Sequence, residues 1–373
     1  MLKMALNQES SASEAQALAK LRELLKPVPF VSLGAQSREP ANAVANWHPD
    51  FSIDLQADGD HWRLICEVKA DGQPRHMRGA ALQLKDYVQR FASVDAHARA
   101  YPVVMAPFIS PASAEICKEA GVGFADLAGN CRLAFGRVYI EKSTAKNPFR
   151  RRRVQRSLFA DKSARVLRLL IAEPDRLWRV AQLAQTAQVS LGQVSNLRQR
   201  LLDVEWVVIE KDGLRLSKPR ELLDAWRQAY RLDPERSESC YTLLHGEGLD
   251  KALRAALAEA GRGQHAVLAS YSAGGWLAPF VRVASLYLYA DQQGEIVLRK
   301  HLKLEPPGKG ANVSLMQPKD AGVFLDRVEA AEGLWCTSPI QTYLDLAVSG
   351  ERGAEAAEHL FNERIAPGWK TKR

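Results

Sequence analysis

Residues 178–216 read WRVAQLAQTAQVSLGQVSNLRQRLLDVEWVVIEKDGLRL, and the order of apolar, polar and turn-forming residues in this stretch determines the fold that we expect around it. Its central part predicts a helix from Leu191 to about Val204, because apolar residues recur there three and four positions apart. Ser190 stands directly before this helix and has the hydroxyl that favours a helix N-cap. The residues expected to face a core are Val194, Leu197 and Leu201.

The flanking residues predict the rest of a compact motif. Residues 163–172 have the spacing of an amphipathic helix, and a second helical segment begins at Trp178. Residues 186–188 are small and polar, which suits a turn before the next helix. Residues 206–216 form two apolar runs around an Asp-Gly dipeptide, which is typical of a tight hairpin turn. Three helices followed by a hairpin are typical of a winged helix-turn-helix.

The polar side of the helix after Ser190 carries residue types that can read base edges. Glutamine and asparagine can pair with adenine, and arginine with guanine, in the major groove. Basic residues on the hairpin, and a run of four arginines before the first helix, would meet phosphates or a minor groove. Two alternatives are a solvated arginine linker and a motif used only for protein contacts. The predicted DNA contacts are Arg150, Arg151, Arg152, Arg153, Arg179, Ser190, Gln193, Ser195, Asn196, Gln199, Arg200, Lys211 and Arg215.

Positive charge gathers in the same part of the chain. The formal net charge is +8, but residues 142–231 hold 20 Lys and Arg against 9 Asp and Glu, a net of +11, so the remainder carries about −3. A local excess of this kind is the electrostatic footprint of a polyanion binder. An ordinary solvated charged face is the alternative interpretation.

Cysteine usage and hydropathy exclude several classes of protein. The five cysteines are scattered, odd in number and without a C-x-x-C pair, which argues against a disulfide framework and a zinc site. We therefore expect buried thiols in a reducing cytoplasm. No apolar run approaches the ~20 residues that span a bilayer, and the first residues lack the apolar segment of a signal peptide. We expect a cytoplasmic protein with no membrane contact.

A second constellation lies in the first third of the chain. Residues 51–69 predict two strands joined by a turn, and Asp50 and Asp54 belong to the first strand region. Glu67 and Lys69 share one face of the second strand, because side chains alternate along a strand. Two carboxylates from adjacent strands can hold a divalent metal, and a lysine beside them can orient a water or stabilise charge at phosphorus.

This D…E-x-K arrangement, with Pro49 before Asp50, resembles the PD-(D/E)xK restriction-endonuclease-like superfamily. The following helix at 76–92 carries Gln83 and Tyr87 on one face, similar to an element of some of those nucleases. A scaffold that no longer cleaves and ordinary surface charge are the alternatives, since activity depends on sub-ångström geometry. For an active nuclease the catalytic residues would be Asp50, Asp54, Glu67, Lys69 and Gln83, with Mg²⁺ held by Asp54 and Glu67.

The alternation of expected strands and helices favours a multi-domain α/β protein. We expect an N-terminal helix in residues 1–30 and a restriction-endonuclease-like α/β domain in 31–145. The basic linker and winged helix-turn-helix occupy 146–225, and an α+β domain occupies 226–373.

The C-terminal domain has a faint likeness to nucleotidyltransferases. Residues 272–275 (Ser-Ala-Gly-Gly) precede residues 286–289 at a similar distance. In those enzymes the second segment carries metal-binding carboxylates, whereas this chain has Tyr287 and Tyr289 there. Two-metal chemistry therefore lacks its ligands, which leaves a non-catalytic, degenerate relative or a coincidence.

Several segments together resemble the antitoxin-like regulators of abortive-infection, type IV toxin–antitoxin systems (AbiEi). The resemblance covers about residues 45–369 and implies a bacterial DNA-binding regulator that binds promoter DNA through its winged helix and can repress its own operon. The shortest antitoxins of this group lack the nuclease-like front domain that this chain carries. Whether the protein has a partner toxin is therefore left open. The segments are 121–133, 190–196, 310–313, 338–346 and 352–361.

The leading hypothesis is a sequence-specific double-stranded-DNA-binding transcriptional regulator, associated with the bacterial nucleoid and carrying a retired nuclease-like domain. This hypothesis requires no cofactor for DNA binding and favours a protein without enzymatic activity, whereas Mg²⁺ would be needed by a nuclease. The rival is a Mg²⁺-dependent DNA endonuclease guided by the winged helix. A third hypothesis is an antitoxin that contacts a toxin protein through the C-terminal domain. A homodimer is plausible because helix-turn-helix proteins often read two half-sites.

Overall fold

The computed structural model describes residues 2–37, 49–94, 99–143, 158–233, 236–260, 265–280, 284–307 and 310–370. The chain divides into two compact units, which are described separately. Unit 1 comprises residues 1–151 with 203–205, and unit 2 comprises residues 152–202 and 206–373.

Unit 1 is an α/β structure built on a seven-stranded sheet whose strands follow one another in chain order. The pairs β3–β4 and β4–β5 are parallel, and every other neighbouring pair is antiparallel. The elements are α1 (Leu2–Leu25), β1 (Val31–Ser37), β2 (Phe51–Ala57), β3 (Asp60–Val68), α2 (Pro74–Val94), β4 (Arg99–Ala106), α3 (Pro111–Glu119), β5 (Gly123–Asp126), β6 (Cys131–Phe135) and β7 (Val138–Lys142).

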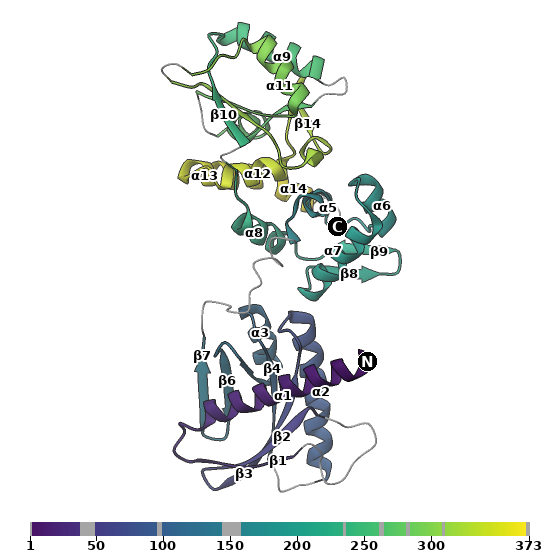
Figure 1. Ribbon diagram of the computed structural model, residues 1–373, viewed down its shortest axis with the longest axis vertical. Coiled ribbons are helices and arrows are strands. Elements are labelled where there is room, and N and C mark those ends of the chain that lie inside the picture. Colours follow the sequence, from purple (N-terminus) through teal and green to yellow (C-terminus); the bar gives the residue numbers. More distant parts are fainter. Residues whose placement is uncertain are drawn as a thin grey trace. The chain divides into compact units, whose positions relative to one another are not determined.

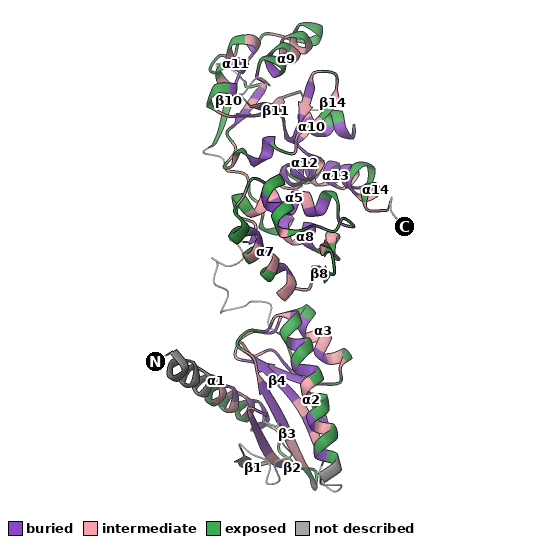
Figure 2. Ribbon diagram, turned by 90° about the vertical axis from the view of Figure 1, so that its right-hand side faces the viewer, coloured by how far each residue is buried: buried purple, intermediate pink, exposed green. Residues whose placement is uncertain are grey.

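Helices cover both faces of this sheet (Figures 1 and 2). Leu21 and Leu25 of α1 pack with Phe51 and other residues of one face, and Leu84 of α2 packs with Ile65 and others of the opposite face. The strands contribute apolar residues to the clusters on both faces of the sheet, because successive side chains of a strand point to opposite faces.

Two features of unit 1 differ from the sequence prediction. Within the N-terminal helix expected in residues 1–30, the capping-box spacing of Ser11 and Glu14 predicts a start near residue 10, but α1 already begins at Leu2. The preceding residues contain no Gly or Pro, so nothing stops the helix at Ser11. Strand β1 was not predicted, since Gly34 and serines interrupt its apolar residues, and pairing with β2 supplies what local propensity lacks.

Unit 2 begins with three helices and a two-stranded hairpin, at the positions expected from the sequence (Figure 1). These are α5 (Asp161–Ala172), α6 (Val180–Thr186), α7 (Leu191–Asp203), β8 (Val207–Glu210) and β9 (Gly213–Leu216). Helix α8 (Pro219–Ala229) follows. Trp178 extends the hairpin, because its backbone exchanges hydrogen bonds of 2.8 and 2.9 Å with Leu214.

The rest of unit 2 is a six-stranded mixed sheet of strand order β10-β13-β12-β11-β15-β14, with helices packed against it. Its elements are β10 (Ser237–Cys240), α9 (Gly246–Ala260), β11 (Ala266–Leu268), α10 (Ser270–Leu277), β12 (Leu286–Ala290), α11 (Gln292–Leu302), β13 (Val313–Met316), η2 (Ala321–Phe324), β14 (Val328–Ala331), β15 (Leu334–Cys336), α12 (Pro339–Ala347), α13 (Glu351–Leu360), η3 (Phe361–Ile365) and α14 (Ala366–Lys370). One continuous apolar core joins this sheet and its helices to α5–α8.

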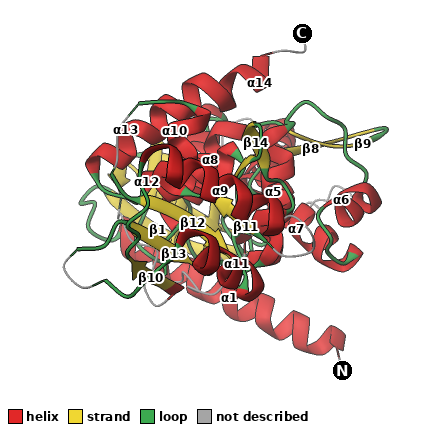
Figure 3. Cartoon of the chain, turned by 90° about the horizontal axis from the view of Figure 1, so that it is seen from above, coloured by secondary structure: helices red, strands yellow, loops and turns green. Residues whose placement is uncertain are grey.

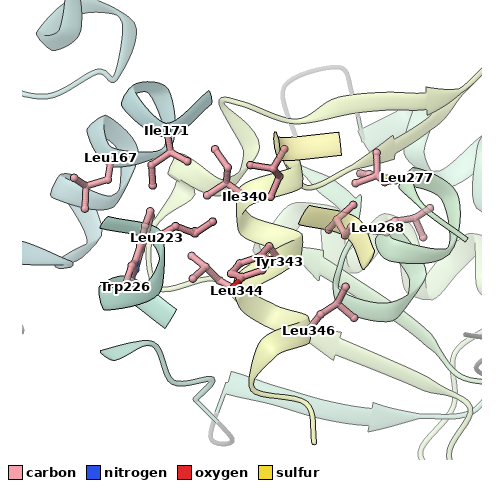
Figure 4. Close-up of a cluster of buried hydrophobic side chains, with 14 of the residues drawn as sticks. Leu167, Ile171, Leu223, Trp226, Leu268, Leu277, Ile340, Tyr343, Leu344 and Leu346 are labelled. Carbon is pink, nitrogen blue, oxygen red and sulfur yellow. The ribbon is translucent and has the colours of Figure 1, made fainter. Parts of the chain in front are cut away.

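Helix α12 occupies the centre of that core (Figure 4). Ile340 and Leu344 lie on the side of Ile171 of α5 and Trp226 of α8, and Leu346 lies toward the sheet and α10. Every residue from 340 to 346 is buried. The polar side chains of α12 must therefore find their hydrogen bonds inside the protein.

A buried polar network meets most of this requirement and leaves Oδ2 of Asp345 buried without a hydrogen-bond partner among the described residues. Oδ1 of Asp345, in α12, accepts hydrogen bonds from the Tyr230 hydroxyl (2.6 Å), Gln341 Nε2 (3.0 Å) and the Tyr289 hydroxyl (3.2 Å). Gln341 Oε1 in turn accepts from Nη1 of Arg168 in α5 at 3.2 Å. Burial raises the pKa of Asp345 to about 6, although its three donors and Arg168 favour the ionised form.

Arg168 anchors α5 to the sheet region of unit 2. Its side chain is 4% exposed, and its Nε lies 2.7 Å from Oδ2 of Asp326. A neighbouring pair, Arg165 with Asp320, repeats the arrangement one helical turn away with two hydrogen bonds, of 2.5 and 2.7 Å. A guanidinium matches a carboxylate through fixed, parallel bonds. These pairs therefore set the orientation of α5.

The remaining expectations on composition can be checked within the described residues. All five cysteines are buried and unpaired, as predicted. In the described ranges, no helix combines the length and the apolar character needed to cross a membrane.

The first testable consequence concerns Asp345. Its folded pKa of about 6 lies above the ordinary aspartate pKa of 3.8, so the folded state binds the proton more tightly and loses stability as pH rises through this interval. The loss amounts to about 3 kcal/mol at pH 7. We expect Asp345→Asn to remove this fall in the free energy of unfolding between pH 4 and 7, measured by urea denaturation. The control is Asp175→Asn, an exposed position, which should keep the fall in the free energy of unfolding between pH 4 and 7. If Asp345→Asn showed the wild-type pH profile, the fall would not be due to Asp345.

The second consequence concerns the hairpin turn. A Cβ at Gly213 would lie 2.7 Å from the Trp178 carbonyl oxygen, which the Trp178–Leu214 pairing holds in place. We expect Gly213→Ala to lower the free energy of unfolding by about 1–3 kcal/mol, as for other overpacked sites. Gly248→Ala is the matched control, since a Cβ there meets nothing within 4 Å. Equal thermal unfolding of both variants would contradict this account.

Candidate nucleic-acid interface

The turn between α6 and α7 is short and internally bonded. Gln188 adopts a left-handed conformation with φ of 53°, and the Val189 amide donates to the Ala184 carbonyl at 3.0 Å. A left-handed residue just past a helix end lets the chain reverse while the last carbonyls stay bonded. This geometry fixes the start of α7 relative to α6.

Ser190 and Gln193 form a reciprocal cap at the start of α7. The Gln193 amide donates to Ser190 Oγ at 3.3 Å, and Gln193 Oε1 accepts from the Ser190 amide (3.2 Å) and hydroxyl (3.3 Å). The sequence predicted the cap from Ser190 alone, whereas Gln193 was expected to face DNA. In the structure, the acceptor oxygen of Gln193 is occupied by the cap.

Helix α7 has one buried and one exposed side. Val194, Leu197 and Leu201 are 1%, 3% and 1% exposed and belong to the core of unit 2. The opposite side turns outward, with Asn196, Gln199 and Arg200 exposed and Ser195 half-buried. Arg198, which the sequence did not single out, is half-buried, and its Nε is buried without a hydrogen-bond partner among the described residues.

The remaining described cations of the predicted interface belong to the hairpin and to the start of α6. Figure 3 shows where the β8–β9 hairpin, α6 and α7 lie in the cartoon. Lys211, at the hairpin turn, and Arg179, directly before α6, are exposed. Arg215 is less available, because its Nε donates to Glu210 Oε1 across the hairpin at 2.9 Å. Arg150, Arg151, Arg152 and Arg153 lie outside the described residues.

The predicted front site of unit 1 forms where β2 begins and β3 ends. Asp50 Oδ2 accepts from the Val68 amide at 2.6 Å, and Lys69 Nζ lies 2.7 Å from Glu67 Oε1. Glu67 is 5% exposed, and its Oε2 is buried without a hydrogen-bond partner among the described residues. The β2–β3 register pairs Phe51 with Cys66, which places Asp50 beside Glu67.

Electrostatics couple these groups. Burial raises the pKa of Glu67, and the nearby Asp50 raises it further, whereas Lys69 and, to a smaller extent, Gln83 favour the ionised form. Burial likewise raises the pKa of Asp50, against the Val68 amide and Lys69. Gln83 donates to the Tyr87 hydroxyl at 2.5 Å, as their spacing on one helical face predicts. The structure thus gathers Asp50, Glu67, Lys69 and Gln83.

Asp54 does not belong to this cluster. It lies four residues along the strand from Asp50, roughly 13 Å at about 3.3 Å per residue. Both of its carboxylate oxygens accept from Arg63 of β3, at 2.6 and 2.9 Å. The pair Asp54 and Glu67, predicted to hold Mg²⁺, is therefore separated, and Asp50 takes the place expected for Asp54. In the described part of the chain, no three His, Cys, Asp or Glu side chains are grouped to hold a metal.

Two further motifs serve the fold. In the segment 121–133, buried Asp126 accepts from the amides of Ile109 (2.9 Å) and Asn130 (2.8 Å) and from Asn130 Nδ2 (2.7 Å). These bonds hold the β5–β6 turn. In the segment compared with nucleotidyltransferases, Ser272 Oγ accepts from the Tyr287 amide at 2.8 Å.

Sequence reasoning missed the residues that bind α5 to α12. Arg168 and Tyr230 come from separate segments, and only the fold brings them to Gln341 and Asp345. Asp326, from a third segment, bonds to Arg168. The one available signal was the number of polar residues within the otherwise apolar stretch 338–346.

Comparison with known protein families gives a match over part of the chain. Residues 215–366 match the model of a family described as "Transcriptional regulator, AbiEi antitoxin, Type IV TA system". The match supports a regulator or antitoxin role, and it confirms the predicted resemblance over these residues, which include α8 to α13. The front unit and α5–α7 precede the matched range. Neither the curated proteins nor the solved structures gave a match.

Proposed function

We propose that this protein is a sequence-specific double-stranded-DNA-binding regulator, or antitoxin-like repressor, that docks a winged helix-turn-helix on its operator. One observation carries the proposal: α7 buries its apolar side in the core of unit 2 while Asn196, Gln199 and Arg200 face outward. In this function α7 is the recognition helix and β8–β9 is the wing. Lys211 and Arg179 contact phosphates, which position the protein without selecting sequence.

The other parts of the chain have supporting roles in this proposal. The C-terminal sheet region, which contains most of the antitoxin-family match, holds α5 through Arg165 and Arg168 and so presents the reading helix rigidly. The front unit is a retired nuclease scaffold in the bacterial cytoplasm. Two copies of the chain would read two half-sites, as dimeric helix-turn-helix proteins do. A toxin protein is a further candidate partner of the C-terminal region.

The DNA-binding proposal predicts a loss of affinity on changing the exposed face of α7. We expect Asn196→Ala and Arg200→Ala each to weaken binding of a selected duplex by about 1–3 kcal/mol and to relax its sequence preference, because each removes a base contact. Affinity should also fall steeply with salt, since neutralised phosphates release counterions. Fluorescence anisotropy between 50 and 200 mM salt measures both effects.

The control is Gln228→Ala, an exposed residue of α8 outside the interface. It should bind as the wild type does. Unchanged affinity and sequence preference in both α7 variants would contradict the assignment of the recognition helix. Binding of the wild type that is insensitive to salt would contradict the phosphate contacts.

A second candidate, a metal-dependent DNA endonuclease, is favoured by the orphaned carboxylate oxygen of Glu67. Two adjacent carboxylates supply the hard oxygen ligands that Mg²⁺ prefers, so Asp50 and Glu67 would hold the ion. Arg63 already neutralises Asp54. Bound Mg²⁺ would act as a Lewis acid at a phosphoryl oxygen. Lys69 would contribute positive charge beside it.

We expect the retired state, because Lys69 is bound to a nearly buried Glu67 and its charge is partly neutralised there. Purified protein with supercoiled plasmid and Mg²⁺ or Mn²⁺ should therefore give no nicking or linear product on an agarose gel. The opposite outcome has a recognisable pattern. Cleavage that Lys69→Ala, Asp50→Asn and Glu67→Gln abolish, and that Asp54→Asn retains, would establish the nuclease with Asp50 and Glu67 at its metal site.

A further inference from the structure

The first position of α7 carries an apolar side chain that the fold does not use. Leu191 is 57% exposed, although it adjoins the capped start of the helix and could have been any polar residue. In the major groove, apolar side chains recognise one group above all, the C5-methyl of thymine. Leu191 therefore has a chemical use at a DNA surface that it lacks in solvent.

The next residue, Gly192, is not required by the backbone or by packing. A Cβ built on it meets nothing within 4 Å, and its backbone is helical. Glycine is nonetheless the poorest helix former after proline. A missing side chain is useful where the backbone must come close to a ligand. The fold therefore gives no reason of its own for a glycine at position 192.

Asn196 is the side chain of this face best suited to pair with a base. It is exposed, and its amide has no bonded partner among the described residues. It follows Gly192 by four positions, so both lie in one row along the helix. A bidentate pair with adenine needs a free donor and a free acceptor. Gln193 does not meet this condition, because its Oε1 is engaged in the cap with Ser190.

Guanine is disfavoured by the same part of the helix. Recognition helices contact base edges with their N-terminal residues. The first two turns of α7, residues 191–197, contain no arginine or lysine, which are the usual partners of guanine. The nearest arginine, Arg198, is half-buried.

We propose, building on the DNA binding proposed above, that α7 selects A·T base pairs in the major groove. Asn196 pairs with an adenine, Leu191 contacts a thymine methyl, and Gly192 lets the helix approach closely enough for both. The ligand is therefore double-stranded DNA whose half-site contains adenine and thymine where the first two turns of α7 enter.

Base analogues test this assignment one atom at a time. The wild-type protein first enriches a duplex from a pool of random 20-base-pair duplexes. Single positions of the enriched duplex are then replaced by 7-deazaadenine, which lacks the N7 acceptor, or by uracil, which lacks the thymine methyl. We expect one adenine position to weaken wild-type binding about 2- to 10-fold. One thymine position should weaken it about 4-fold.

The variants identify which residue reads which atom. Asn196→Ala should be insensitive to the 7-deazaadenine that weakens the wild type, and Leu191→Ala insensitive to the uracil. Gly192→Ala should weaken binding of the unmodified duplex, whereas the Tm of the variant protein should stay the same as that of the wild type or rise. Gly248→Ala, the matched control, should change neither the affinity nor the analogue effects.

The same experiments separate a lack of A·T selection by α7 from a lack of DNA binding. Should the pool yield no enriched sequence and no salt-dependent binding, DNA binding itself is refuted. An enriched duplex whose analogues weaken the wild type and the variants equally would overturn the A·T assignment alone. So would an enriched half-site made of G·C pairs, or a Gly192→Ala variant that binds as tightly as the wild type.

Discussion

The burial of α12 on every side is the constraint on which the organisation of unit 2 depends. A helix without a solvent-facing side cannot leave polar side chains to water, and an unpaired polar group in the interior is costly. Gln341 and Asp345 therefore have to be met by partners from other elements, and Tyr230, Tyr289 and Arg168 supply them. These partners belong to, or directly follow, other elements. The hydrogen bonds to the polar side chains of α12 therefore orient α8, β12 and α5 together. The apolar contacts around Ile340 and Leu344 fill the space between these bonds.

This arrangement explains how a short motif becomes a rigid one. Helices α6 and α7 are brief, and their apolar residues alone form a small core. Through α5 they share a continuous core with the C-terminal sheet, and Arg165 and Arg168 add directional bonds at the junction. Rigid presentation matters for base reading, since side chains must be held within a fraction of an ångström of productive geometry. The stretch that matches the antitoxin family thus lies behind the proposed reading surface as its support.

What could be predicted from sequence was local. The spacing of Val194, Leu197 and Leu201, the Ser190 cap and the Asp-Gly turn each act within a few residues, and the corresponding elements are present. Register and distant partners could not be predicted. Asp54 and Asp50 are equally good carboxylates in the sequence, and only the pairing of Phe51 with Cys66 places Asp50 beside Glu67. Arg168 reads as one more surface cation of an amphipathic helix, yet its partner Asp326 lies 158 residues away.

The shared core of unit 2 also couples the stability of α7 to that of residues that α7 does not contact. Because buried residues of α5–α8 and of the C-terminal sheet belong to one cluster, local opening of that sheet is coupled to loss of the helices. A nucleic acid bound at α7 would slow hydrogen exchange in β11 and β12. The front unit, whose described buried residues form clusters of their own, would keep its exchange rates. Binding of a nucleic acid to α7 would therefore also protect the C-terminal sheet of unit 2 against proteases.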